Sequence, residues 1–275
     1  MKKFGFIRNS TIFSIPYDFR RFPGKFMIDH LKEAIKIAKN KSGRQINIVT
    51  HSYGCLQVLH ALSKYKRSFI KNNINNVNLI SCPLVGSPKT ILSLFTGNID
   101  TDLSDSLKKR NFFKTILPTY QSIAMFLPNE MYKNKNKIVF IKDGVNYTVN
   151  QLDDILPKDI VSRRRYAGNI IKEIFFFLKI NKKYKFVNIN CIYSYTNSNN
   201  TVESFNYDTK KVNFTIGDDS ITLSDLRICN EFVTNSQHIK EIKYQEHSKI
   251  LQSNQLIQYI IDQNLKSENV EILKK

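Results

Sequence analysis

The pentapeptide THSYG at residues 50–54 contains a serine, Ser52, that could act as a nucleophile. A nucleophile elbow places its serine on a sharp turn between a strand and a helix, and the usual pattern is G-x-S-x-G. The second glycine is present here, whereas the bulkier Thr50 replaces the first. A β-rich run at residues 45–50 precedes the serine, and a segment of helical period follows it. This context matches what an elbow requires, and an ordinary serine in a turn is an equal alternative at this point.

A serine nucleophile needs a base that takes its proton and an acid that orients the base. On a fold with such an elbow the chain order is Ser, then Asp or Glu, then His. His247 follows a predicted strand at 239–244, from which a loop can reach over the sheet. His238 precedes the same strand and would project from the opposite sheet edge. We therefore take His247 as the candidate base, and the alternative for either residue is an ordinary surface histidine.

The candidate acid lies in GDDS, residues 217–220, directly after a predicted strand at 212–216. Asp218 and Asp219 both stand there, and the alternative is a plain Asp-rich turn. His51 is a poor base, because its side chain should diverge from that of Ser52. We expect His51 to pack or to hydrogen-bond locally.

The elements around the serine alternate between helix and strand. Apolar residues at helical spacing predict an amphipathic helix at 25–40, and strands are predicted at 45–50 and 76–82. This order implies a parallel sheet with helical crossovers. We read residues 1–275 as a single α/β domain in which about 95–185 form an inserted cap or lid.

The inserted region and the segments after it are less regular. Residues 137–141 read as a strand, and the basic run at 163–165 precedes a Phe-rich helix candidate at 170–180. Further strand signals occur at 187–193, and a final amphipathic helix is predicted from about 250 to 265.

The composition indicates a folded, basic protein. Hydrophobic residues make up 41% of the 275 residues, enough for a sizeable core. The 42 Lys and Arg outnumber the 23 Asp and Glu, and the net charge of +19 favours anionic partners. The alternative is that Lys is the default surface residue, because the basic residues are spread along the chain. With no recognition-helix or stacking-aromatic motif, we expect no nucleic-acid partner.

Neither a signal peptide nor a membrane-spanning segment is visible in the sequence, which leaves the compartment open. The four cysteines lack CxxC spacing, so we expect no metal site and no cofactor. The oligomeric state is open as well.

Five short stretches match, in order, the motifs of one known family. Residues 15–20, IPYDFR, look like A-P-Y-D-W-R, and residues 49–54, VTHSYG, look like V-x-H-S-M-G. Residues 81–88, SCPLVGSP, look like A-P-W-G-G, and residues 217–224, GDDSITLS, look like G-D-G-T-V-P-x-x-S. His247 precedes an apolar helix, as the family's catalytic histidine does. The chain thus resembles the lecithin:cholesterol acyltransferases and the related lysosomal-type phospholipases of the α/β-hydrolase fold.

The resemblance implies an α/β-hydrolase-like fold, a mostly parallel sheet with helices on both faces, and a role for each matching residue. Ser52 resembles the nucleophile and His247 the base. Asp218 resembles the acid, because the family acid directly follows the glycine. The backbone N–H of Tyr53 would be one oxyanion donor.

Cys191 and Cys229 fall where the family has a disulfide. A Cys191–Cys229 bridge is therefore expected, and it would suggest a secretory or lumenal compartment. The alternative is two buried free thiols.

The chain departs from the family pattern at its start and at three positions. It begins almost at the first motif, whereas the family has earlier strands and a loop that supplies the second oxyanion donor. Loss of one donor typically costs about 10²–10³ in turnover. The sequence could be a fragment, half of a split protein or a degenerate homologue, or another donor could serve. Phe19 and Leu84 replace family tryptophans and Val85 replaces a glycine, so substrate contacts there are not carried over.

The resemblance implies acyl transfer from a glycerophospholipid ester, through an acyl-serine intermediate, to a lipid alcohol or water. The alternative is a catalytically inactive, truncated homologue that acts as a lipid-binding or interaction protein. The positive charge and the apolar residues 175–178 would suit peripheral contact with an anionic membrane surface. The alternative for that segment is a cap or core helix.

Overall fold

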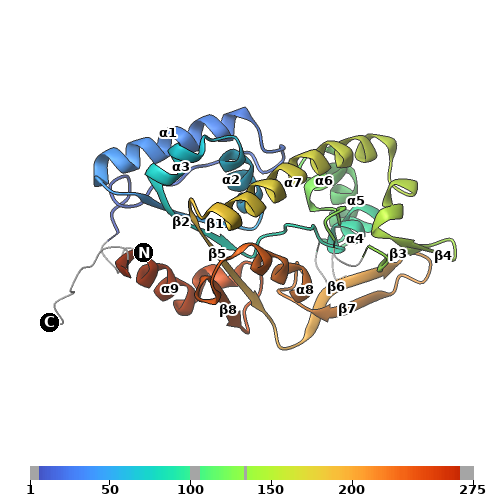
Figure 1. Cartoon of the computed structure of the whole chain (residues 1–275). Coiled ribbons are helices and arrows are strands. Elements are labelled where there is room, and N and C mark those ends of the chain that lie inside the picture. Colours follow the sequence, from blue (N-terminus) through green and yellow to red (C-terminus); the bar gives the residue numbers. More distant parts are fainter. Residues whose placement is uncertain (1–5, 100–105, 133–134, 267–275) are drawn as a thin grey trace.

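A four-stranded parallel sheet forms the centre of the larger part of the molecule (Figure 1). The computed structural model describes residues 6–99, 106–132 and 135–266. The strand order is β1-β2-β5-β8, and all three pairs are parallel. The strands are β1 (Ile46–His51), β2 (Ile74–Ile80), β5 (Asn188–Tyr195) and β8 (Ile239–Lys243). The predicted parallel sheet is therefore confirmed, and β1 lies at one edge of it.

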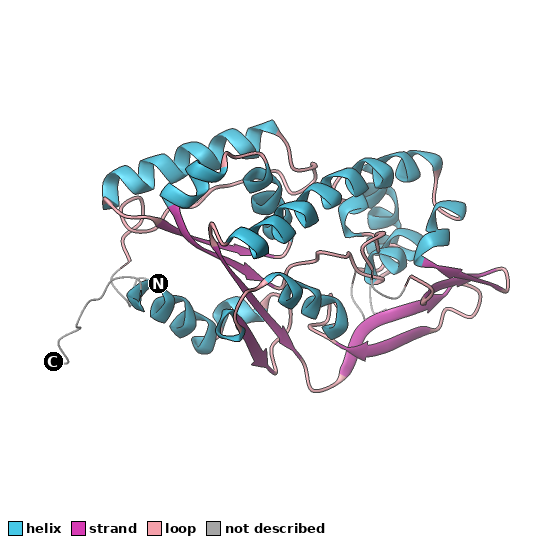
Figure 2. Ribbon diagram, in the orientation of Figure 1, coloured by secondary structure: helices cyan, strands magenta, loops and turns pink. Residues whose placement is uncertain are grey.

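Helices cover both faces of this sheet, as predicted (Figure 2). One face carries α1 (Lys25–Ser42), α2 (Tyr53–Ser63), α3 (Arg67–Asn73) and α7 (Lys158–Tyr184). On the other face, Ile80, Ile192 and Ile242 of the strands form a buried cluster with residues of the C-terminal helical segment. That segment comprises a 3₁₀ turn (Lys249–Gln252) and α9 (Asn254–Lys266). The arrangement is that of an α/β-hydrolase-like fold.

The sequence of helix α1 explains both its buried face and the residue at which it ends. Met27, Leu31 and Ile35 recur every four residues and bury one stripe of the helix. Gly43 ends the helix in the left-handed region, with φ 68°, and its N–H donates to the Lys39 carbonyl. The helix predicted at 25–40 is thus confirmed and extends to Ser42.

A second four-stranded sheet lies beside the first, with the order β4-β3-β6-β7 (Figure 1). It comprises β3 (Ile138–Lys142), β4 (Val145–Thr148), β6 (Asn199–Asn206) and β7 (Val212–Ile216). Two antiparallel hairpins, β3–β4 and β6–β7, are joined by the parallel pair β3–β6. The strand predicted at 212–216 exists, but it belongs to this second sheet because it folds back on β6.

Short helices and turns connect the two sheets. They are α4 (Lys89–Thr96), α5 (Leu107–Ile116), α6 (Ile123–Phe126), α8 (Leu223–Leu226) and 3₁₀ turns at Leu117–Thr119, Val149–Asp154, Arg227–Phe232 and Ser236–His238. None of the helices within the described ranges is both long and apolar enough to cross a membrane.

The Phe-rich segment at 170–180 is the second half of the 27-residue helix α7. Phe175 and Phe177 are buried, and Phe175 contacts Phe232 edge-on at 5.3 Å between ring centroids. Only Phe176 of the three phenylalanines is exposed, at 66%. The segment is a core helix, which was the alternative to membrane contact.

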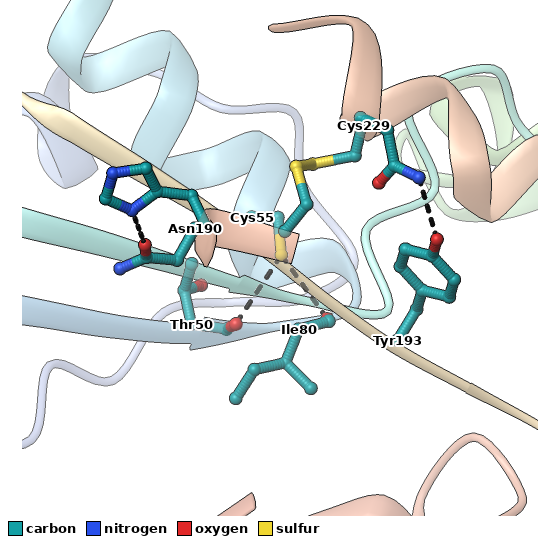
Figure 3. The surroundings of a disulfide bond; sticks show 9 residues. Thr50, Cys55, Ile80, Asn190, Tyr193 and Cys229 are labelled. Carbon is teal, nitrogen blue, oxygen red and sulfur yellow. Dashed lines mark hydrogen bonds between the residues drawn. A yellow bond between two sulfur atoms is a disulfide. The ribbon is translucent and has the colours of Figure 1, made fainter. Parts of the chain in front are cut away.

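A buried polar network crosses the first sheet. The Asn190 amide donates to Asn78 Oδ1 at 3.0 Å, and the Asn78 amide donates to the Ile48 carbonyl at 3.2 Å. His238 Nδ1 lies 2.6 Å from Asn190 Oδ1 (Figure 3). Burial lowers the pKa of His238. His238 therefore belongs to the sheet, at the end where β8 begins, and cannot reach Ser52.

Candidate active site

Ser52 stands on a sharp turn between β1 and α2. Its backbone has φ 52° and ψ −127°, a conformation that costs free energy for a residue with a side chain. The Ser52 N–H donates to the Ile80 carbonyl at 2.9 Å, which ties the turn to the neighbouring strand. Helix α2 begins at the next residue, Tyr53. This strand–turn–helix geometry is what a nucleophile elbow requires.

Tight packing explains why the elbow has glycine at one flank only. A Cβ atom on Gly54 would lie 2.7 Å from Thr50 Oγ1 and 3.3 Å from Tyr17 Oη. The Thr50 side chain, 8% exposed, occupies the space next to Gly54. Thr50 is therefore accommodated only because residue 54 has no side chain.

The structure brings Ser52, His247 and Asp218 into one hydrogen-bonded chain. His247 Nε2 lies 2.8 Å from Ser52 Oγ, and His247 Nδ1 lies 2.7 Å from Asp218 Oδ2. The residues are far apart in sequence, and β8 and the loop after it carry His247 to the elbow. With Nδ1–H donating to the carboxylate, Nε2 is free to accept the hydroxyl proton of Ser52.

Asp218 is fully buried, and its carboxylate is held by the chain around it. Its Oδ1 accepts the backbone N–H of Ser220 at 3.1 Å and that of Ile221 at 2.8 Å, which leaves Oδ2 for His247. Gly217 permits this turn, because a Cβ atom there would lie 2.3 Å from the Ile221 carbonyl oxygen. Asp219 has φ 81° and directs its side chain toward Lys89 Nζ at 3.4 Å. Of the two adjacent aspartates, Asp218 is the one at His247.

His51 contacts His247, a residue that sequence reasoning did not connect with it. His51 Nε2 lies 2.8 Å from the His247 carbonyl oxygen, and the two rings are 4.8 Å apart. The His247 N–H also donates to the Asp218 carbonyl at 2.6 Å. Burial, and then the nearby His247, lower the pKa of His51. Because a carbonyl oxygen can only accept, His51 Nε2–H is the donor in this hydrogen bond to the backbone of His247.

Tyr53 lies where a first oxyanion donor is expected. Its N–H is the first of α2, and the first N–H groups of a helix have no acceptor within that helix. Its buried phenol donates to the Arg21 carbonyl at 2.6 Å, and its ring contacts Tyr17 edge-on at 6.0 Å. The segment from Tyr17 to Arg21 thus lies directly on the residue that follows Ser52.

The structure joins Cys191 and Cys229 in a disulfide with a Cα–Cα distance of 5.8 Å (Figure 3). The bridge ties β5 to the 3₁₀ turn Arg227–Phe232 that precedes β8. Cys55 and Cys82 are free and buried, and Cys55 Sγ lies 3.6 Å from the Thr50 carbonyl oxygen. Across the described part of the chain, no three His, Cys, Asp or Glu side chains gather as metal ligands would.

Comparison with known proteins gives one family. The model of the lecithin:cholesterol acyltransferase family matches residues 1–191. This match includes Ser52 and ends before Asp218 and His247, so the geometry alone connects those two residues with the serine.

Two curated relatives and one solved structure illustrate the likeness. Lecithin-cholesterol acyltransferase-like 1 of Arabidopsis thaliana is 26% identical over 164 residues, which are 55% of this chain and 37% of that protein. Phosphatidylcholine-sterol acyltransferase of Homo sapiens is 26% identical over 149 residues, 52% of this chain and 32% of its own length. The chain thus spans about a third of these relatives.

Among solved structures, a chain of the Tle4–Tli4 complex superposes with a TM-score of 0.62 at 9% identity, over 90% of this chain and 66% of that one. At this identity the likeness shows the fold alone.

Proposed function

Because this chain belongs to the lecithin:cholesterol acyltransferase family, we propose that it is a serine-dependent lipid acyltransferase or phospholipase acting on glycerophospholipid esters. The observation that carries the proposal is the continuous hydrogen-bonded chain from Ser52 Oγ through His247 to the buried Asp218. A serine nucleophile, a base that takes its proton and an acid that orients the base are the parts that acyl transfer through serine needs.

In the first half-reaction, Ser52 Oγ attacks the ester carbonyl carbon while His247 Nε2 takes the hydroxyl proton. Asp218 stabilises the imidazolium that forms and keeps its orientation. The negative charge of the tetrahedral intermediate faces the N–H of Tyr53. The C–O bond to the glycerol breaks, and His247 returns the proton to the departing lysolipid alcohol. An acyl-serine remains.

In the second half-reaction, water or a lipid alcohol attacks the acyl-serine. His247 takes the proton of the acceptor and returns it to Ser52 Oγ as the acyl group leaves. The acceptor decides whether the protein acts as a phospholipase or as an acyltransferase. Residues 95–185 were expected to form a cap, but α7 within this range lies on the first sheet. We therefore propose that only the described residues before α7 act as a cap, which would limit the access of water to this step.

Replacing the nucleophile tests the proposal. We expect the whole chain to react covalently with a fluorophosphonate probe and to cleave a soluble short-chain ester. Ser52→Ala should abolish the labelling and lower ester hydrolysis by about 10⁴-fold or more. Labelling is read by mass spectrometry of the modified peptide, and hydrolysis is read by product release.

Ser63→Ala is the matched control, because Ser63 lies at the other end of α2 and its hydroxyl donates to the His60 carbonyl within the same helix. This variant should label and hydrolyse like the wild type. A folded wild-type protein that shows neither labelling nor hydrolysis would overturn the proposal in favour of an inactive lipid-binding homologue.

A further inference from the structure

A cleft of about 980 Å³ opens beside the elbow, outside the triad. Its walls come from the segment that leads into α1, from α2 through Gln57 and from α7 through Arg163 and Tyr166. Phe22 and Met27 contribute apolar wall, and Phe22 packs against Tyr166 with 5.0 Å between ring centroids. The volume lies at the upper end of the range of about 300–1,000 Å³ that is usual for ligand sites.

Aromatic side chains stand exposed around the mouth of this cleft. Phe19 and Phe26 are each 59% exposed, and Tyr166 is 56% exposed. Phe26 and Tyr166 line the cleft, and Phe19 contacts Tyr120, which adjoins the lining residue Gln121. Three large exposed aromatic residues around one opening form an apolar rim that water solvates poorly.

Basic side chains surround the same rim. Residues 18–25 contain three basic residues and one acidic residue, a net charge of +2. Arg20 and Arg21 share Asp18 as their partner, at 2.9 and 3.5 Å, and the Arg21 side chain is 78% exposed. Arg21 and Lys25 both line the cleft. The opening therefore combines apolar contact with an excess of positive charge.

The cleft is connected to the elbow through Tyr53. Tyr53 donates to the carbonyl of Arg21, and Tyr17, which lines the cleft, packs on Tyr53 and next to Gly54. A lipid engaged at this rim would thus lie against the segment that covers the residue after Ser52.

We infer that this rim, made of Phe19, Arg21, Lys25, Phe26 and Tyr166, docks the protein on an anionic phospholipid bilayer and that the cleft receives the head group of one phospholipid. The inference rests on the proposed function and adds to it where the substrate surface is met. Aromatic side chains favour the membrane–water interface, and each basic residue near the surface strengthens binding to anionic lipid.

A second hollow shows what distinguishes the rim. This hollow, of about 480 Å³, lies between α2, α3 and α7 and is lined by Phe176, Lys64 and Glu173 among others. Two of its three lining cations are paired with carboxylates, Lys64 with Glu173 at 2.6 Å and Lys172 with Glu130 at 3.0 Å. The third, Arg67, lies over the ring of Tyr184 at 5.3 Å. The C-terminal half of α7, which lines this hollow through Phe176 and Ile180, therefore supplies exposed residues for control substitutions away from the rim.

Vesicle binding by the full chain carrying Ser52→Ala tests the inference without hydrolysis of the lipid. We expect co-sedimentation with vesicles of phosphatidylcholine mixed with phosphatidylglycerol, and weaker binding to vesicles of phosphatidylcholine alone. The rim variant combines Phe19→Ser, Phe26→Ser, Arg21→Gln and Lys25→Gln. Removal of each basic residue should lower the affinity for anionic vesicles about fivefold. The rim variant lacks two of them, so its affinity should fall by more than about twentyfold, and the loss of the two aromatic rings should lower it further.

The control variant combines Phe176→Ser, Tyr184→Ser, Lys179→Gln and Lys183→Gln, so it also removes two aromatic rings and two positive charges. It should keep the binding of the parent protein. Equal loss of binding in both variants would show a general charge effect and overturn the inference. Displacement of the protein from the vesicles by single-stranded DNA, added at the same negative charge as the anionic lipid, would overturn it as well. Circular dichroism and thermal unfolding establish that each variant is folded.

Wild-type protein assayed on a soluble ester separates the two proposals. Hydrolysis without vesicle binding would overturn the docking surface and leave the proposed function intact. Rim-dependent vesicle binding without hydrolysis would support the docking surface and count against the proposed function.

Discussion

The imidazole of His247 is fixed by contacts on both its ring and its backbone. Asp218 accepts from the ring and from the N–H, while His51 donates to the carbonyl. His247 Nε2 lies 2.8 Å from Ser52 Oγ. A shift of the backbone of the loop that carries His247 would lengthen this distance even if Asp218 kept the imidazole ring in its orientation. We therefore propose that His51 is a positioning residue for the proposed base.

Substitution of His51 tests this role. His51→Ala should lower kcat for a soluble ester by about 10-fold or more, because a net hydrogen bond is worth about 0.5–1.5 kcal/mol and the freed loop adds misalignment. KM should change little, since His51 does not face the substrate. His51→Gln keeps an N–H donor and should recover part of the rate. An effect on KM alone, or no rescue by glutamine, would contradict a positioning role.

At this scale the sequence predicted most of the residues of the candidate site. The order Ser, Asp, His and the glycine before Asp218 led to the three residues that the structure brings together. The contact of His51 was not predictable, because it depends on where a loop almost two hundred residues later passes, at a separation of 196. The residues next to His51 in the sequence give no information about the position of that loop.

At the scale of elements, the elbow depends on the pair Thr50 and Gly54. Gly54→Ala should destabilise the fold by about 1–3 kcal/mol, as overpacking does, although alanine is the better helix former. In a Thr50→Ala background the same change should cost less, because Oγ1 at 2.7 Å is then absent. Denaturant unfolding of the four proteins measures the coupling. An equal cost in both backgrounds would refute the contact as its cause.

The elements of the first sheet were predictable and those of the second were only partly so. Strands β2 and β5 are short, mostly buried runs, and the edge strand β1 is partly buried. All three stand next to helical segments, which is a pattern that local sequence reveals. The polar sequence NNTVESFN of β6 gave no such signal. The sheet to which β7 belongs depends on its pairing with β6, so finding the strand at 212–216 did not place it.

At the scale of the whole molecule, one apolar cluster runs through both sheets. It includes Leu56 of α2 and Leu79 of β2 together with Phe140 of β3 and Phe205 of β6. We propose on this basis that the described parts act as a single domain and unfold together. The Cys191–Cys229 bridge encloses the β6–β7 hairpin and Asp218 in its loop.

Reduction of this bridge should lower the stability of the whole protein. Closure of a loop with a sequence separation of 38 is worth about 2–4 kcal/mol, chiefly through the unfolded chain. Unfolding with and without a reductant measures the difference, and a Cys191→Ser/Cys229→Ser variant should not respond to the reductant. Equal stability of the oxidised and the reduced wild type would contradict a stabilising bridge.

The polar network of the buried Asn78 and Asn190 with the half-buried His238 should favour one register of β8 against β5. If β8 slipped by one residue against β5, its side chains would change faces and it would move by about 3.3 Å along its axis. The slip would separate His238 from Asn190 and leave buried polar groups unpaired, at a cost of about 1–3 kcal/mol each. The same slip would displace His247 by more than its 2.8 Å hydrogen bond to Ser52. A chain in the shifted register would therefore lose both the hydrogen bond of His238 to Asn190 and the contact of His247 with Ser52.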